Sequence, residues 1–171
     1  HVTGVQTCAL PIFKELVALA KQKPGSLNYG SSGVGGSLHL AAELFKTRTG
    51  AAMNHIPYKG AAQMMPDLIS GQIHMAFASL ISVLPQIKTG KVRLLAVLEP
   101  QRVAAVPDTP ALAETVPDFR KPPSWLGFFA PAGLTSALTT RLNSEFVRVL
   151  RSDEVRGKLE SDGVPVVANS A

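Results

Sequence analysis

Apolar residues recur along the chain in two rhythms, one helical and one strand-like, and Gly and Pro residues separate them. Helical spacing of the apolar positions predicts amphipathic helices over residues 13–23, 38–47, 61–70, 82–89, 135–151 and 152–161, and a short helix within 109–116. Short apolar runs between turn residues predict strands over residues 27–29, 54–58, 73–80, 92–98, 124–130 and 164–167. Gly50, Gly71 and Gly90 follow predicted helices directly, where glycine commonly ends a helix.

Strands and helices alternate from residue 27 to residue 98, with short turns between them. This alternation is typical of an α/β protein whose parallel sheet is covered by helices on both faces. Six prolines interrupt the rhythm between residues 99 and 123. That segment is therefore predicted to be a connection or a lobe boundary.

Composition and charge exclude several classes of protein. The chain is 46% hydrophobic and 17% charged, which suits a folded core. Its net charge is +5, but the basic residues are scattered and never occur three in a row, so we expect no nucleic-acid partner. One cysteine and four dispersed histidines predict neither a disulfide within the chain nor a metal site. We also expect no cofactor and no membrane-spanning helix.

The segment 1–12 (HVTGVQTCALPI) differs in character from the rest of the chain. The string VTGVQTCALPI resembles the translation of a common sequencing adapter, so residues 1–12 are predicted to be a non-native leader. An ordinary leader is the alternative. On the first interpretation Cys8 gives no information on the redox compartment, and the natural N-terminal part of the protein lies outside this chain.

A turn rich in glycine and serine joins the strand at 27–29 to the helix at 38–47. Glycines leave backbone N–H groups uncovered by a Cβ atom, serines add hydroxyl donors, and the helix that follows presents the positive end of its dipole. Such a turn binds a carboxylate or phosphate favourably. Tyr58, Lys59 and Gly60 form a second, smaller junction of this kind. The small residues of the first turn are Gly30, Ser31, Ser32, Gly33, Gly35, Gly36 and Ser37.

Three enzyme motifs fail at this turn. A P-loop requires Lys after its last glycine, whereas Ser37 and Leu38 follow Gly36. The dinucleotide fingerprint that would begin at Gly33 requires glycine where Leu38 stands. The nucleophile elbow G-x-S-x-G is absent. We therefore expect no catalytic activity. A glycine-rich connection that binds no ligand remains the alternative to an anion site.

Several ordered stretches resemble the tripartite tricarboxylate transporter substrate-binding receptors, also called the TctC or Bug family. The stretches are LNYGSSGVGGSLHLAAELFK, HIPYKGAAQMMPDLISGQI, LPQIKTGKVRLLAVLEPQR and SWLGFFAPAGL, and the resemblance covers residues 13–171. It implies an α/β fold of the periplasmic binding protein type II kind, with two lobes, incomplete in this chain. It also implies a periplasmic, non-catalytic receptor that delivers a small organic acid to membrane permease subunits, and we expect a monomer.

The resemblance also places the ligand contacts. The family often has Phe-Asp where this chain has Phe77 and Ala78, so a polar contact that selects the ligand is predicted to be missing. His39, on the first turn of a helix, is predicted to donate to an anion, with a capping or packing role as the alternative. The complete predicted set is Ser31, Ser32, Gly33, Gly35, Gly36, Ser37, His39, Tyr58, Lys59, Gly60, Ala78 and Ser79.

The resemblance divides the chain into four parts. Residues 1–12 are the leader, 13–98 part of the second, ligand-binding lobe, 99–123 a crossover or hinge, and 124–171 the C-terminal part of the first lobe. The family's glycine-rich loop of the first lobe, which grips the ligand, and its signal peptide have no counterpart here. Two alternatives remain: an effector-binding domain of a transcriptional regulator with the same fold, and a truncated receptor without independent function.

Overall fold

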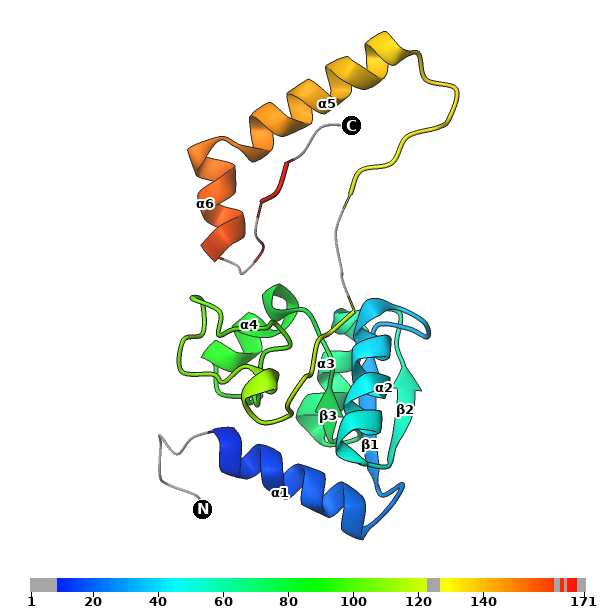
Figure 1. Cartoon of the computed structure of the whole chain (residues 1–171), viewed down its shortest axis with the longest axis vertical. Coiled ribbons are helices and arrows are strands. Elements are labelled where there is room, and N and C mark those ends of the chain that lie inside the picture. Colours follow the sequence, from blue (N-terminus) through cyan, green and yellow to red (C-terminus); the bar gives the residue numbers. More distant parts are fainter. Residues whose placement is uncertain (1–8, 123–126, 162–163, 165, 169–171) are drawn as a thin grey trace. The chain divides into compact units, whose positions relative to one another are not determined.

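The computed structural model describes residues 9–122, 127–161, 164 and 166–168. The chain divides into two units, residues 1–123 and 124–171. The helices are α1 (Ala9–Gln22), α2 (Ser37–Thr49), α3 (Ala61–Ser70), α4 (Leu80–Lys88), α5 (Ser136–Leu150) and α6 (Asp153–Ser161), with a 3-10 turn η1 (Leu112–Glu114). The strands are β1 (Leu27–Ser31), β2 (Met53–Pro57) and β3 (Met75–Ala76) (Figure 1).

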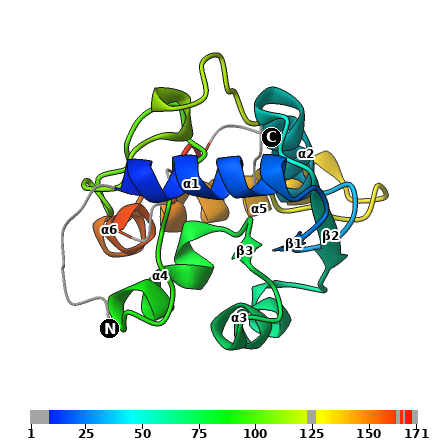
Figure 2. The same ribbon diagram turned by 90° about the horizontal axis from the view of Figure 1, so that it is seen from below.

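A three-stranded parallel sheet in the order β2-β1-β3 organises the first unit. The central strand β1 leads into α2, which lies with α1 on one face of the sheet (Figure 2). The outer strands β2 and β3 lead into α3 and α4 on the other face. This confirms the predicted α/β class with a parallel sheet covered on both faces.

Each face of the sheet has its own hydrophobic core. Alternation along β1 sends Leu27 and Tyr29 to the α2 face, where they pack with Phe45. On the other face, Met64 of α3 packs with Ile73 in the second core. Gly30 of β1 lies beneath both of these side chains, and a Cβ built there would meet each of them. A glycine in the middle of a strand therefore marks the close approach of α3 to the sheet.

Two helices end at glycine as the sequence predicts, whereas Thr89, not Gly90, is the C-cap of α4. Gly50 (φ 70°) and Gly71 (φ 80°) adopt the left-handed conformation directly after α2 and α3, and their N–H groups donate to Lys46 O and Leu68 O. At the other end, the Thr135 hydroxyl caps α5 by accepting from Leu138 N.

Several predicted elements are wrong in type or extent. No strand forms over 92–98; instead the Val97 N–H donates to Pro110 O, and Val97 O accepts from Leu112 N. The strand predicted over 73–80 shrinks to two residues, because Leu80 already begins α4. The helix predicted within 109–116 is only the η1 turn.

The segment ends differ as well. The α1 helix begins at Ala9, inside the segment predicted as a leader, and residues 1–8 lie outside the described residues. Of the strands predicted over 124–130 and 164–167, the described parts have no regular structure, and residues 124–126 and 165 lie outside the description.

Helix α5 of the second unit carries a partly exposed apolar stripe. Neither α5 nor α6, both fully described, contains a buried residue. Phe128 stacks on Phe146 at a ring-centroid distance of 4.3 Å. Such a stripe is the face that a helix normally turns toward a core. Its members, each between 39% and 45% exposed, are Leu138, Leu142, Phe146 and Val149.

Two classes of feature are missing from the described part of the chain. None of its helices is long and apolar enough to cross a membrane. Within residues 9–122 and the described segments beyond, no three His, Cys, Asp or Glu side chains gather in a way that could hold a metal ion.

Candidate functional site

The carboxyl ends of the three parallel strands meet at one edge of the sheet. Three loops leave this edge: residues 32–36 after β1, 58–60 after β2 and 77–79 after β3. The loop from the central strand turns toward the α2 face, whereas the loops from its two neighbours turn toward the α3 and α4 face. Strand ends from which neighbouring loops diverge in this way open a crevice, where α/β proteins commonly bind their ligands.

The three helices that start at this edge lack side-chain caps. Gly36, Gly60 and Ser79 occupy the N-cap positions of α2, α3 and α4, and no side chain accepts a capping hydrogen bond in any of these three described helices. None of the three has an acidic residue in its first turn. No acidic side chain in these first turns accepts from the N–H groups or neutralises the positive dipole ends, and the carboxylate of a bound molecule can do both.

The loop after β1 is held by hydrogen bonds at both ends. Ser31 is fully buried, and its hydroxyl donates to Gly33 O at 3.2 Å and lies 2.7 Å from His55 Nε2. The Gly35 N–H donates to Nδ1 of His39 at 3.2 Å. Gly33 (φ 115°) and Gly35 (φ 80°) have backbone conformations that L side chains rarely adopt, so this loop requires glycine at both positions.

A polar cluster lies beneath this loop on the α2 face. The Tyr29 hydroxyl donates to Glu43 Oε1 at 2.6 Å, and Lys46 Nζ donates to the same carboxylate at 2.8 Å. The His55 ring stacks on the Tyr29 ring with centroids 4.9 Å apart. The His39 ring lies against the His55 ring, with centroids 4.3 Å apart. Two imidazoles, a phenol, a carboxylate and an ammonium thus form one connected network below the loop of residues 32–36.

Burial and charge shift the pKa of three groups in this cluster. Burial, and secondarily the hydrogen bond to Glu43, raises the pKa of the Tyr29 phenol. Burial raises the pKa of Glu43, but hydrogen bonds from Lys46 and Tyr29 outweigh it and leave that pKa lowered. Burial and the charge of His39 lower the pKa of His55. Near neutral pH the cluster therefore contains a neutral phenol, a carboxylate and a neutral His55.

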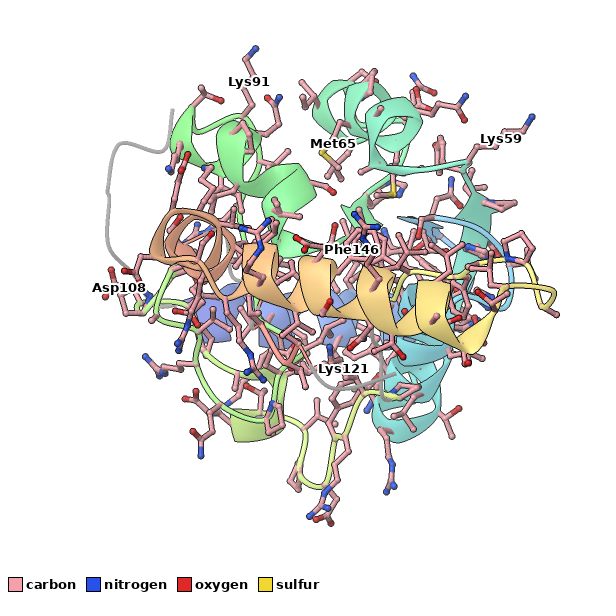
Figure 3. The ribbon with its side chains drawn as sticks, turned by 90° about the horizontal axis from the view of Figure 1, so that it is seen from above. Lys59, Met65, Lys91, Asp108, Lys121 and Phe146 are labelled. Atoms are coloured by element: carbon pink, nitrogen blue, oxygen red, sulfur yellow. The ribbon has the colours of Figure 1, made fainter. Side chains whose placement is uncertain are left out.

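The side chains of the loop after β2 do not point along this edge of the sheet. The Tyr58 N–H donates to Ser31 O, which ties this loop to the first one, but the Tyr58 hydroxyl donates to Asp67 on α3 at 2.8 Å. Lys59 is exposed, and its side chain points outward (Figure 3). The backbone at Gly60, rather than either side chain, is what this loop brings to the edge.

The loop after β3 is short. The Phe77 N–H donates to Gly30 O, and its ring lies in the first core. Ala78 is half-buried and adds no polar group, whereas Ser79 is exposed and its hydroxyl lies 2.7 Å from that of Ser82.

The structure thus brings the three predicted segments to one edge, but several of their side chains are already hydrogen-bonded to other parts of the protein. Ser31 is bonded inside the loop, and Tyr58 is bonded to α3. Neither Glu43 nor His55 belongs to the set of site residues predicted from the sequence. Alternation along β2 places His55 on the same face as buried Met53, which is a usable signal, but the pairing of His55 with Tyr29 depends on the register of the sheet.

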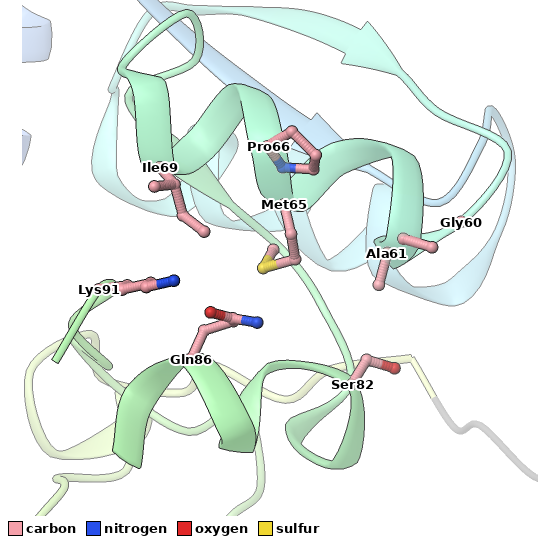
Figure 4. Close-up of a pocket in the computed structure, with 9 residues that line it drawn as sticks. Gly60, Ala61, Met65, Pro66, Ile69, Ser82, Gln86 and Lys91 are labelled. Atoms are coloured by element: carbon pink, nitrogen blue, oxygen red, sulfur yellow. The ribbon is translucent and has the colours of Figure 1, made fainter. Parts of the chain in front are cut away.

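A separate groove of about 620 Å³ lies between α3 and α4 (Figure 4). Of the predicted site residues, only Gly60 lines it. Met65, Pro66 and Ile69 form its apolar wall on α3, and Gln86 faces them from α4. The remaining lining residues are Ala61, Ala62, Ser82 and Lys91. The groove therefore adjoins the α3 N-terminus and does not include the glycine-rich loop.

The fold class is that of the periplasmic solute-binding proteins. R. palustris Rpa4515, solved with adipate, superposes with a TM-score of 0.84 at 36% identity, covering 89% of this chain and 51% of that chain. The family model described as "Tripartite tricarboxylate transporter family receptor" (TctC) matches residues 5–171. The chain belongs to this family, as its sequence motifs predict.

Curated relatives agree with this assignment. A UPF0065 protein of Bordetella pertussis is 38% identical over 130 residues, which are 76% of this chain and 40% of that protein. Protein BugT of the same organism is 35% identical over 155 residues, which are 90% of this chain and 47% of that protein. The chain spans about half the length of the relatives it matches.

Proposed function

We propose that this chain is part of an extracytoplasmic solute-binding receptor, whose ligand is a small carboxylated solute held at the sheet edge where β1 ends. The observation that carries the proposal is the set of three uncapped helices that begin at one sheet edge without an acidic residue in their first turns. A carboxylate placed there accepts from helix N–H groups and lies at positive dipole ends. The likeness to a receptor solved with adipate, a dicarboxylate, supports this ligand class.

Family membership supports the wider setting of the proposal. The receptor works in the periplasm as a monomer and passes its ligand to the membrane permease subunits of a tripartite transporter. The same membership favours a receptor over the effector-binding domain of a transcriptional regulator. Within the chain, residues 13–98 form part of the ligand-binding lobe, 99–123 the crossover, and 124–171 part of the other lobe. The division of the chain after residue 123 supports that boundary.

Binding rather than catalysis is the proposed activity. The contact of 2.7 Å between Ser31 and His55 has the atoms of a nucleophile and its base. However, Ser31 is fully buried, and its hydroxyl is also bonded to Gly33 O. A substrate carbonyl cannot reach a buried hydroxyl, so this pair holds the loop in shape instead.

The replacement Gly36→Asp tests the proposed anion site. Gly36 has an extended backbone (φ −69°, ψ 162°), and a Cβ there meets no atom within 4 Å, so the aspartate fits as an N-cap. Its carboxylate accepts hydrogen bonds from the helix N–H groups that would otherwise donate to the ligand. We expect the free energy of unfolding to rise by only about a few tenths of a kcal/mol, because glycine is itself a fair N-cap residue, and the adipate-induced rise in melting temperature to disappear.

The matched control is Gly133→Asp, because a Cβ at Gly133 also meets nothing within 4 Å and the change in charge is the same. Thermal unfolding of the chain is followed with adipate, succinate and citrate, and with the uncharged adipamide as a ligand control. The control variant should respond to the acids as the parent chain does. A shift that survives in Gly36→Asp would place the ligand elsewhere, and no shift with any acid in the parent chain would refute carboxylate binding.

A further inference from the structure

His39 occupies the backbone donor that an anion would use. Its Nδ1 accepts from the Gly35 N–H at 3.2 Å, directly before the uncapped start of α2. A ring nitrogen that accepts a hydrogen bond is unprotonated, so this contact requires a neutral His39 with its proton on Nε2. The side chain therefore serves as an acceptor from within the protein, at the place where the proposed function puts a carboxylate.

Protonation reverses the role of this ring. Once Nδ1 carries a proton, it can only donate, and the Gly35 N–H loses its acceptor. The loop then presents two donors, Gly35 N–H and His39 Nδ1–H, and one positive charge. A carboxylate has two oxygens that can accept from both.

We propose that His39 is a proton-linked positioning residue of the anion loop: a ligand carboxylate displaces it from Gly35 N–H, and the displaced ring takes up a proton from solvent. The inference rests on the proposed function, since it assigns the regulation of the same site. By linkage, acid strengthens carboxylate binding, and carboxylate binding strengthens proton uptake by the same factor.

The charged groups around His39 decide which imidazole takes the proton. Glu43 Oε1 lies 3.9 Å from His39 Nε2 on the same helix and favours a positive ring. The ring of neutral His55 on β2 lies beside it, with centroids 4.3 Å apart, and Lys46 of α2 and the neutral Tyr29 phenol of β1 both donate to the same Glu43 carboxylate. Burial penalises a charge on His55, which also keeps its contact with Ser31. The added proton therefore goes to His39.

The ligand-free chain provides the first test. In nuclear magnetic resonance spectra recorded from pH 8 to pH 5, the Gly35 amide and the His39 ring should titrate together, and exchange of the Gly35 N–H with solvent should accelerate in acid. The His39→Gln variant should abolish the titration of Gly35. The control is His74→Gln, since His74 Nδ1 also accepts a backbone N–H, that of Asn28 at 3.0 Å, but at the opposite end of β1. A Gly35 amide that does not follow His39 would overturn the proposal.

Adipate binding provides the second test. Calorimetry in two buffers of different ionisation enthalpy should show uptake of up to one proton per adipate. The affinity should rise by up to about tenfold per pH unit as the pH falls from 8 to 6. His39→Gln should bind adipate without proton uptake, and His74→Gln should behave as the parent chain.

The outcomes separate the two proposals. Adipate binding to the parent chain with no proton uptake and equal affinity at pH 6 and pH 8 would overturn the role of His39 and leave the proposed function intact. If adipate bound at neither pH, the proposed function would be refuted. The displacement of His39 by a ligand carboxylate would be refuted as well. The Gly35 titration would then still decide whether His39 is a proton-dependent acceptor.

Discussion

The replacement Gly30→Ala probes how closely α3 packs on the sheet. A Cβ added at Gly30 would lie 2.7 Å from Met64 Sδ and 2.7 Å from Ile73 Cδ1, closer than non-bonded atoms approach. Met64 is fully buried and Ile73 nearly so, which leaves neither side chain space to withdraw. Overpacking of this kind costs about 1–3 kcal/mol. The melting temperature should fall by about 2–8 °C for each kcal/mol.

Urea unfolding followed by circular dichroism measures this cost as a lower midpoint with an unchanged slope. The control is Gly133→Ala, because a Cβ there meets no atom within 4 Å. The double variant Gly30→Ala with Ile73→Val removes the clashing atom of one of the two side chains, so it should lose less stability than the sum of the single variants. Equal midpoints for Gly30→Ala, Gly133→Ala and the parent chain would refute direct contact between α3 and β1.

Three further predictions concern pH and helix stability. Burial lowers the pKa of His55, so as the pH falls the unfolded chain protonates His55 before the folded chain does. The free energy of unfolding should therefore fall as the pH drops below about 6.5, and His55→Asn should flatten that decline in acid-unfolding curves. Hydrogen bonds from Arg102 lower the pKa of Glu114 from 4.5 to about 2, so its stabilising contribution should be complete above pH 4.5 and fade toward pH 2, and Glu114→Gln should abolish this dependence. Gly157→Ala, in the interior of α6 with open space around it, should stabilise that helix by about 0.5–1 kcal/mol, and unchanged ellipticity and melting temperature would contradict this.

The sequence predicts best where a local rule suffices. The helix Ala61–Ser70 has the bounds that its apolar spacing and Gly71 predict, because the signals that begin and end a helix lie within a few residues of its ends. The same holds at Gly50 after α2. The alternation of strands and helices likewise predicts the parallel sheet, since each parallel pair requires a crossover helix.

The failures occur where the structure depends on residues far apart in the chain. The segment 92–98 is apolar because Ala96 and Leu98 pack on the first core, not because it joins the sheet. Its backbone partners at 110–112 follow a proline-rich connection that no periodicity describes. In the candidate site, the positions of the loops follow from nearby residues, namely the glycines and the ends of the adjoining strands and helices. The link from Ser31 to His55 depends on strand register, which the sequence alone does not specify.

The three uncapped helix starts have a consequence for motion as well as for binding. A helix whose first turn lacks a cap frays there, and its amide protons exchange quickly with solvent. Under the proposed function, an anion at the shared edge would act as a common cap for helices that are far apart in the sequence but follow strands ending at that edge. Ligand should therefore slow hydrogen exchange in the first turn of α2 and in those of its neighbours together, while exchange in their last turns stays unchanged.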